Sequence, residues 1–416
     1  MPVTALGITA PLARYARRFH QVAGAGHHVA SPLGAWLLLA LAGPACAGDD
    51  LRQLEEILGA DADAAAGIAA ELLAHPHPVV HAAAAVWGGN GSAAGARIAS
   101  WRAGLPPQVD TGPVPGQAEL DAWARRQTLG LIDRFPVEDG RMLIWLLAAR
   151  VSWERPFDLA PASALGSASR WATALTRVLR TPEGPGNGRV PGHDQFIAAT
   201  DAAGEVAVHA ARARDGLLVV SVAAAPEVPA ADVLSAAYDL GTALAAGRPL
   251  TRRSLFDLAL GEGPAWAITQ ERAGTAAPGG REERCTAVLP AWSARSTHQL
   301  TDPRLGFAAV RHALDPIDPW EARQAAMASY TRIGFEAGAV TALAIALSAV
   351  AQRPGVRRTA ELRFGHPFAV VALAAGNAKP HDSHRPVPRS PWHGLPVFSV
   401  WVADPQDATA EPNSTS

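Results

Sequence analysis

Three histidines stand close together in the segment HPHPVVH, and histidine is a common ligand of zinc. They are His75, His77 and His81. A zinc site needs three or four converging ligands with an acidic or other partner behind them. Pro76 and Pro78 place the segment in a turn between a helix and a strand, and no cysteine or carboxylate is interleaved. The alternative is a set of exposed loop histidines. We favour it, so no metal is expected.

Two further segments have residue types that can support catalysis. WGGNGSAAG, residues 87–95, is glycine-rich like a phosphate-binding turn, but its glycines do not form G-x-G-x-x-G. HDSHRP, residues 381–386, has the residue types of a catalytic triad, but neighbours in a proline-rich loop cannot converge on one reacting atom. Neither G-x-S-x-G nor H-E-x-x-H occurs. The sequence therefore predicts a protein that is not an enzyme and needs no cofactor, which favours a binding or inhibitory role.

Composition indicates a soluble globular protein. Of 416 residues, 49% are hydrophobic and 6% aromatic, which supports a substantial core. Thirty-six Lys and Arg balance 38 Asp and Glu, so neither nucleic acid nor a membrane is expected as a partner. Cys46 and Cys285 offer no disulfide framework. The start of the chain does not resemble a secretory signal, and the most apolar run is broken by Pro44, so we expect a cytoplasmic protein.

Hydrophobic periodicity predicts an α+β fold. Helical patterns occur first, and strands mixed with helices follow. The expected helices span 11–24, 32–43, 49–59, 62–75 and 117–132. The expected strands span 79–89 and 141–153, and a hairpin turns at Asp215 and Gly216. Residues 270–284 are predicted to form an exposed loop, because they are polar and rich in glycine.

The segment GFEAGAVTALAIALSAV, residues 334–350, alternates between two faces. One face carries Phe335, Ala337, Ala339, Thr341, Leu343, Ile345 and Leu347, and the other carries Glu336, Gly338, Val340, Ala342, Ala344, Ala346 and Ser348. A period of two is typical of a strand with one buried face. The first half of the segment contains poor strand formers. AQRPGVRR, which follows the whole segment, is predicted to be a loop. On pattern alone, an ordinary core strand is the simplest interpretation.

Six segments resemble the serpin family, in that family's order and spacing. They are VASPLGAWLLLALAG, DDLRQLEEILG, LDAWARRQTLGLI, VSWERPF, LRFGHPFAVVAL and LPVFSVWVADP. The first carries the Ser-Pro start of a family helix at Ser31 and Pro32, and the fifth carries Phe-x-x-Pro-Phe at Phe364, Pro367 and Phe368. Because the matches run from about residue 5 to residue 405, the chain is identified by resemblance as a bacterial-type serpin.

The resemblance implies a fold and a function. The fold would be α+β, with about nine helices packed on three β-sheets and an exposed reactive centre loop. Residues 1–405 would form one domain of a monomer, and residues 406–416 a disordered tail. In serpins a serine protease cleaves the loop, and the loop then inserts into the central sheet while the protease stays covalently attached. The resemblance thus implies an inhibitor of serine proteases. The alternative is a non-inhibitory serpin that is cleaved as a substrate or acts as a binding protein.

The resemblance also assigns site residues. The hinge of the loop falls on Gly334, Phe335, Glu336, Ala337, Gly338, Ala339 and Val340. Counting from the hinge puts the scissile bond at Ser348–Ala349, which suits an elastase- or subtilisin-like protease. Counting back from Phe364 puts it beside Arg357 or Arg358, which suits a trypsin-like enzyme; we prefer the first. The region that controls sheet opening falls on Ser31, Pro32, Trp145, Trp153 and Gln324.

Several positions depart from the family pattern, among them Phe335, Trp145 and Gln324. Phe335 stands where inhibitory members usually have Thr or Ser, and a bulky ring there slows insertion. Trp145 and Gln324 stand where the family has Asn and His, so the usual polar network of the sheet is replaced. These departures favour the non-inhibitory alternative, whereas the alternating segment favours the inhibitor.

Overall fold

The computed structural model describes residues 5–87, 96–134, 141–149, 151–184, 190–214, 216–314, 320–335, 353–376 and 390–408. These residues group into two compact units, each assembled from three stretches of chain. Residues 1–149, 294–328 and 372–400 form the first unit, and residues 150–293, 329–371 and 401–416 form the second. The described part holds nine α-helices and three large sheets, so the predicted α+β class is confirmed. The single domain predicted for 1–405 stays a prediction.

Helices dominate the first unit. They are α1 (Thr9–Ala23), α2 (Pro32–Ala42), α3 (Gly48–Leu58), α4 (Ala62–Ala74), α5 (Ala96–Ala103), α6 (Gln117–Gln127) and α9 (Phe307–Leu314). The whole of α2 is buried, and the Ser31 side chain caps its first turn. The predicted helix 117–132 ends early, because Leu129 adopts a positive φ of 52° that a helix cannot contain. Among the described residues no helix is both long and apolar enough to cross a membrane.

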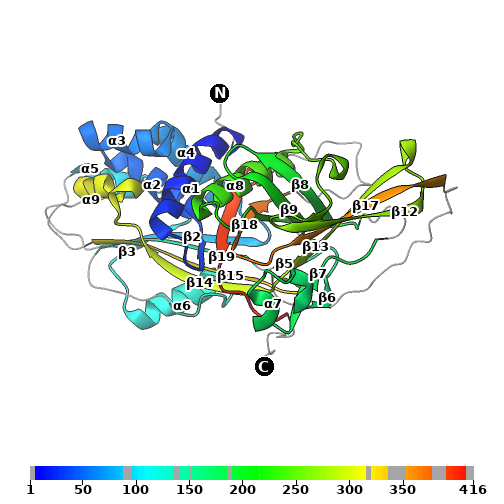
Figure 1. The fold of residues 1–416 in the computed structure, drawn as a ribbon. Helices are drawn as coiled ribbons and strands as arrows, with labels where there is room; N and C mark the ends of the chain where they lie inside the picture. Colours follow the sequence, from blue (N-terminus) through cyan, green and yellow to red (C-terminus); the bar gives the residue numbers. More distant parts are fainter. Residues whose placement is uncertain are drawn as a thin grey trace, which may run out of the picture. The chain divides into compact units, whose positions relative to one another are not determined.

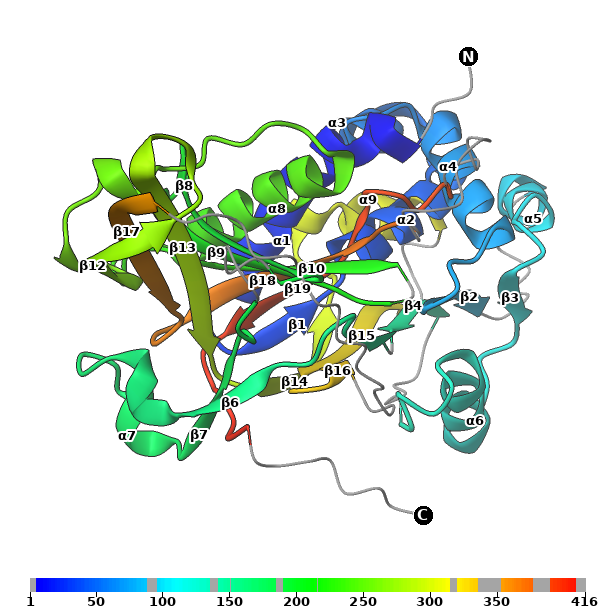
Figure 2. The same cartoon turned by 90° about the vertical axis from the view of Figure 1, so that its right-hand side faces the viewer.

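A five-stranded sheet in the first unit separates α6 from α2 (Figures 1 and 2). Its order is β14 (Trp292–Gln299), β15 (Trp320–Tyr330), β4 (Arg141–Ala149), β2 (Val80–Trp87) and β3 (Val109–Gly112). β15 runs parallel to β4, from Trp320 opposite Arg141 to Ala326 opposite Leu147. On the α6 face, Trp123 packs with Ile144 and Leu146 in one buried cluster. β1 (His28–Ala30) and β19 (Pro396–Val402) adjoin in a second sheet.

Strands dominate the second unit. β8 (His193–Thr200), β9 (Gly204–Arg212) and β10 (Leu217–Ala223) form an antiparallel set, which confirms the predicted hairpin, although Asp215 lies outside the described residues. In the strand order of this sheet, β18 (Phe368–Ala374) lies between β10 and β19. A third sheet has the order β11 (Gly261–Glu262), β12 (Trp266–Thr275), β17 (Arg353–Arg363), β13 (Arg281–Leu289), β7 (Arg177–Arg180) and β6 (Asp158–Pro161). The helices here are α7 (Trp171–Ala174) and α8 (Ala230–Ala246).

Three expectations about loops and ends are corrected. Residues 270–284 are not a loop, because they belong to β12 and β13 and the turn between them. AQRPGVRR is not a loop after residue 352, because β17 begins at Arg353. The tail does not begin at Gln406, because the Gln406 N–H donates to the Ala291 carbonyl and the Asp407 carboxylate accepts from two backbone N–H groups.

The predicted strand 141–153 is interrupted. β4 ends at Ala149, and a short strand, β5 (Val151–Ser152), follows it. β5 pairs with another short strand, β16 (Gly334–Phe335). This pairing brings the predicted hinge to the segment that directly continues β4.

Candidate functional site: the sheet gate and the loop anchor

In the first unit, a buried polar contact joins α2 to β15. The Ser31 N–H donates to Gln324 Oε1 at 2.7 Å, and Gln324 Nε2 donates to the Ser31 carbonyl at 2.6 Å. Both residues are fully buried. The Ser31 hydroxyl also donates to the Val397 carbonyl at 2.8 Å, and it accepts from the Gly34 N–H at 3.1 Å. Gln324 therefore satisfies the Ser31 N–H, which would otherwise be buried without a partner, and it adds a second donor to the Ser31 carbonyl, which also accepts from the Ala35 N–H.

Trp145 lies directly opposite Gln324, across the β4–β15 pair. Its ring packs so closely on α2 that a Cβ at Gly34 would lie 2.3 Å from Trp145 Cδ1. The indole N–H has no hydrogen-bond partner among the described residues. The structure thus brings together Ser31, Pro32, Trp145 and Gln324, which we call the sheet gate. These four were predicted as one group, but the fifth, Trp153, belongs to the second unit.

In the second unit, a set of hydrogen bonds holds the residues that lead into the predicted hinge. The Trp153 N–H donates to the Ile333 carbonyl at 3.1 Å, and the Phe157 N–H donates to the Arg332 carbonyl at 3.0 Å. Trp153 Nε1 donates to the Thr331 carbonyl at 3.0 Å. We call residues 151–157 together with 331–335 the loop anchor. Trp153 therefore supplies two of the hydrogen bonds that hold residues 331–333.

The loop anchor also has a turn of its own. The Thr331 hydroxyl donates to the Gly334 carbonyl at 2.7 Å, and its N–H donates to the same oxygen at 3.1 Å. Gly334 has φ 155°, a backbone angle that a residue with a side chain rarely adopts. The hinge residues 336–340 and the predicted scissile residues Ser348 and Ala349 lie outside the described residues.

Aromatic and histidine rings pack beneath the loop anchor. The buried ring of Trp153 lies 4.8 Å from that of Tyr330, and the Phe157 ring lies 4.7 Å from that of His193. His193 and His209 are hydrogen-bonded through ring nitrogens 3.1 Å apart. Burial lowers the pKa of His193 to about 4 and that of His209 well below its usual value. Both rings are therefore neutral at neutral pH.

Arg357 and Arg358, the alternative scissile residues, lie in the middle of β17. This strand pairs with β12 on one side and β13 on the other. Arg357 forms ion pairs with Glu271 at 3.0 Å and Glu282 at 3.2 Å, and Arg358 donates to the Leu255 carbonyl at 2.7 Å. Both arginines are thus part of a paired strand.

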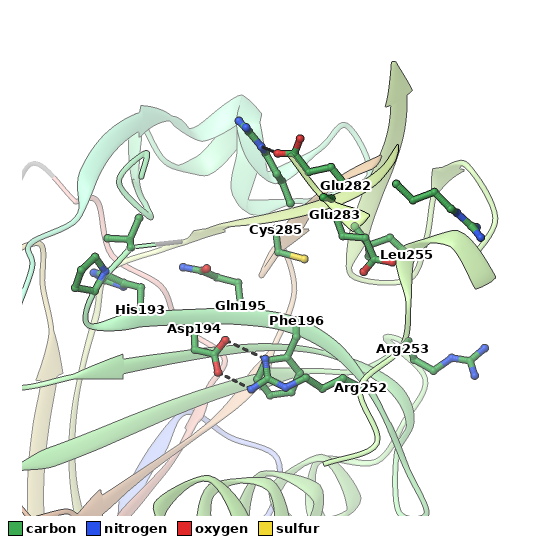
Figure 3. A pocket seen from close by; sticks show the side chains of 15 residues that line it. His193, Asp194, Gln195, Phe196, Arg252, Arg253, Leu255, Glu282, Glu283 and Cys285 are labelled. Atoms are coloured by element: carbon green, nitrogen blue, oxygen red, sulfur yellow. Dashed lines mark hydrogen bonds and ion pairs between the residues drawn. The ribbon is translucent and has the colours of Figure 1, made fainter. Parts of the chain in front are cut away.

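A cleft of about 900 Å³ opens between β8 and β13 (Figure 3). Arg252 donates to both carboxylate oxygens of Asp194, at 3.0 and 2.6 Å, and stacks over Phe196. The sulfur of Cys285 points into the cleft. Burial raises the pKa of this thiol to about 12, so it is protonated and a poor nucleophile at neutral pH. The cleft is better suited to binding than to catalysis.

The three histidines of HPHPVVH do not form a metal site. Within the described ranges, no three His, Cys, Asp or Glu side chains gather as metal ligands. His75 bonds to the carbonyl of Glu71 in its own helix, whereas His77 accepts from the Val79 N–H. His77 is buried, so the expectation of exposed histidines is wrong for this residue. Residues 88–95 and 381–386 lie outside the described part of the chain.

Comparison with solved structures identifies the fold. No protein-family model and no curated protein matches the sequence. Tengpin, a thermophilic serpin in its native state, matches with TM-score 0.61 and 13% identity, over 95% of this chain and 93% of that one. Human thyroxine-binding globulin in complex with thyroxine matches with TM-score 0.61 and 13% identity, over 96% and 99%. Serpin48 of the insect Tenebrio molitor matches with TM-score 0.56 and 14% identity, over 95% and 97%.

The chain therefore has the serpin fold, as its scattered segments predicted. That it is of the bacterial type stays a prediction. Sequence reasoning missed several residues of the site, namely Gly34, Thr331, His193, His209 and Ser221. The one sequence signal for any of them is a polar residue within each apolar strand of the predicted hairpin, His209 on β9 and Ser221 on β10.

Proposed function

We propose that this chain is a serpin-type inhibitor of serine proteases, which traps its target by inserting the cleaved loop into the five-stranded sheet. The segment 336–352 runs between two fixed points. On its N-terminal side, the loop anchor holds residues 331–335. On its C-terminal side, β17 is paired along both edges. A segment that connects two fixed points can act as bait, and a cut within it frees one end to move.

The register of β16 against β5 is the observation that carries this proposal. Gly334 lies opposite Ser152, and Phe335 lies opposite Val151, in antiparallel pairing. Because β5 directly follows β4 in the chain, continued pairing in this register would put residue 337 opposite Ala149 and residue 345 opposite Arg141. The hinge residues would then replace β15 as the neighbour of β4, which is the pairing that insertion requires.

The same register predicts which face of the inserted strand would be buried. Thr341 would lie opposite Trp145, and directly opposed residues in an antiparallel pair point to the same face. Trp145 packs against Gly34 of α2, so the odd-numbered residues would face α2. The even-numbered ones, which include Ala342, Ala344 and Ala346, would lie beneath α6 with Ile144 and Leu146. This agrees with the faces assigned from the sequence pattern alone.

The chemistry is that of an interrupted acyl transfer. The serine oxygen of the protease attacks the carbonyl carbon of Ser348, the bond to the Ala349 nitrogen breaks, and that nitrogen leaves as an amine. An ester then links the protease to Ser348. Insertion must separate β4 from β15, and it must be complete before water hydrolyses this ester. Opening of the sheet gate therefore competes directly with deacylation.

We propose Ser348–Ala349 as the scissile bond, and an elastase- or subtilisin-like enzyme as the target. A protease needs an extended and accessible segment, whereas Arg357 and Arg358 are hydrogen-bonded within a sheet. Cleavage there would require β17 to leave both neighbours. A trypsin-like target is therefore the weaker choice.

The test is to incubate the purified protein with subtilisin, an elastase or trypsin, followed by denaturing gels and mass spectrometry of the released peptide. A protease-sized shift that survives denaturation supports the proposal. Ala349→Pro should abolish cleavage at Ser348–Ala349, while the matched control with Gln at both Arg357 and Arg358 should leave trapping intact. Complete cleavage with fully active protease would overturn the inhibitory function.

A second candidate is a non-inhibitory binding protein with the serpin fold. The cleft of about 900 Å³ favours it, as does the likeness to a thyroxine-binding globulin. Phe335, the first residue that insertion would bury, also favours it. This candidate predicts clean cleavage, no trapping and no gain in heat stability after the cut.

A further inference from the structure

Two buried histidines beneath the loop anchor have their protons fixed by the hydrogen bonds that they make. The carbonyl of Arg155 can only accept, so His193 Nε2, 2.8 Å away, must carry a proton. His193 Nδ1 is then an acceptor, and His209 Nε2, 3.1 Å from it, must be the donor. This leaves His209 Nδ1 without a proton in the neutral pair.

His209 Nδ1 is buried and has no hydrogen-bond partner among the described residues. Across the strand pair, Ser221 on β10 lies directly opposite His209, and its buried hydroxyl oxygen also has no partner there. Opposed residues in an antiparallel pair point to the same face, with Cβ atoms about 4.5–5.5 Å apart. A proton on Nδ1 would create a charged donor, and Ser221 could accept from it if the ring moved towards β10. That movement takes the ring away from His193.

The histidine pair is connected to the loop anchor through two contacts. His193 holds the carbonyl of Arg155, which lies within residues 151–157. The ring of Phe157 packs on both histidines, 4.7 Å from His193 and 5.4 Å from His209. The Phe157 N–H in turn donates to the Arg332 carbonyl. A shift of either ring therefore reaches the backbone that holds residues 331–335.

We propose that Ser221, His209 and His193 form a proton-operated latch, in which proton uptake at His209 Nδ1 loosens the loop anchor. The latch rests on the proposed function in one respect only: loop insertion is the event that release of residues 331–335 would allow. It predicts that the anchor opens more readily as the pH falls from about 6.5 towards 4.

The charged groups near the pair act on it in opposite directions. Arg155 opposes a positive charge on His193, whereas Asp158 favours one. Glu154 lies beside Gly192, Gln195 lies opposite His209 on β8, and the Tyr330 ring lies 5.6 Å from that of Phe157. Burial remains the largest influence on both histidines and lowers the pKa of each. An opened anchor admits water, so the open form binds the proton more tightly than the closed form.

The first unit contains a matched chain that serves as a control. Ser399 Oγ lies 2.8 Å from His20 Nε2, and His20 Nδ1 lies 3.1 Å from His28 Nε2. His28 Nδ1 is 2.8 Å from the Gly26 carbonyl. The order of groups, serine to histidine to histidine to carbonyl, is the same, but neither histidine belongs to the unit that holds the loop anchor.

Hydrogen–deuterium exchange at several pD values tests the latch. The peptides to follow are those covering 151–157 and 328–335, in the wild type and in His209→Gln. Glutamine offers a donor and an acceptor but does not titrate. Compared at equal pD, wild-type exchange in these peptides should rise relative to the variant by about tenfold per pH unit between 6.5 and 4, because opening takes up one proton. The control variant His20→Gln should leave the rise unchanged.

Two outcomes overturn the latch. One is equal exchange in wild type and His209→Gln at every pD, and the other is an equal effect of His20→Gln. If His209→Gln does not fold, Ser221→Ala carries the test: loss of the acceptor should move the rise to lower pH, and an unmoved rise overturns the proposal. No protease enters this measurement. Cleavage without trapping would therefore overturn the proposed function and leave the latch standing.

Discussion

Gln324 pairs with Ser31 through two reciprocal hydrogen bonds, of 2.7 and 2.6 Å, although 293 positions separate them in the chain. The amide side chain satisfies the N–H and the carbonyl of one buried residue, as a strand neighbour would do. Because Gln324 lies on β15 beside β4, this contact also ties α2 to the strand that would have to separate from β4 in the proposed loop insertion. The amide of Gln324 thus makes the polar contact at a position where the family pattern has a histidine.

Gln324→Leu should destabilise the protein by about 1–3 kcal/mol, because it leaves the buried Ser31 N–H without a partner, whereas the Ser31 carbonyl still accepts from the Ala35 N–H. Urea unfolding measures this change. Gln406→Ala is the matched control: Gln406 donates to the Ser293 hydroxyl at an exposed site, and its loss should cost less than about 1 kcal/mol. Equal effects of the two substitutions would contradict the role assigned to Gln324.

Gly34→Ala should cost about 1–3 kcal/mol, because the new methyl group overlaps the ring of Trp145. Gly67 offers a control in α4, where no atom lies within 4 Å of an added Cβ. Gly67→Ala should stabilise the protein by about 0.5–1 kcal/mol through helix propensity. Thermal unfolding of both variants checks the pair. An unchanged Tm for Gly34→Ala would show that Trp145 can move away, and hence that the sheet gate is loosely packed.

Acid should destabilise the protein through its buried histidines. Burial lowers the pKa of His28 and of His193 to about 4, and it also lowers the pKa values of His20, His209 and His298. The unfolded chain binds these protons near pH 6.5, whereas the folded chain binds them only at lower pH. Stability is therefore fully present above about 6.5 and is lost as the pH falls towards 4.

His28 and His193 should each account for roughly 3 kcal/mol of that loss, at 1.36 kcal/mol per pKa unit. Urea midpoints between pH 7 and 4 measure the total. His28→Gln should reduce the slope. A stability that is flat across this range would mean that these histidines are solvated in the folded protein.

Trp153→Phe keeps an aromatic ring beside Tyr330 but removes the donor to the Thr331 carbonyl. The loss of one hydrogen bond should cost about 1 kcal/mol and weaken the loop anchor. Hydrogen–deuterium exchange in residues 331–335 should rise about fivefold. Trp171→Phe, at a buried ring in α7 of the same unit, is the control for the general effect of a smaller ring. If it accelerates exchange in 331–335 equally, the Trp153 hydrogen bond does not hold the loop.

Local signals predicted five of the seven helices described in the first unit, all but α5 and α9, because caps and amphipathic patterns depend on neighbouring residues. The end of α3 at Gly59 is one example, where a left-handed residue follows the last turn. Residues 270–284 were misread because their polarity is typical of loops. In the structure, their charges are paired across strands, as Arg357 is with Glu271 and Glu282. Such pairing joins residues 75 or more positions apart, and no local pattern reveals it.

Within the site, only residues that match a family pattern could be predicted from the sequence. The structure brings Ser31, Trp145 and Gln324 together, whereas Trp153 bonds to Thr331, 178 positions away in the chain. That these residues control sheet opening stays a prediction. The tautomer of His193 depends on the Arg155 carbonyl that its ring meets, and that of His209 depends on His193, and the sequence fixes neither contact. The alternating faces of residues 334–350 could be read at once, because a period of two needs no knowledge of the partner strand.

Thr341→Arg tests the register that supports loop insertion. In that register residue 341 would lie opposite the buried Trp145, so a guanidinium there would have to be desolvated without a partner. The wild type, once cleaved by subtilisin, should gain at least 20 °C in Tm if the strand inserts, whereas cleaved Thr341→Arg should gain little. Glu336→Arg puts the same charge on the opposite face and should keep the gain. If cleaved Thr341→Arg is as heat-stable as the wild type, the inserted strand has another register or the loop does not insert past residue 341.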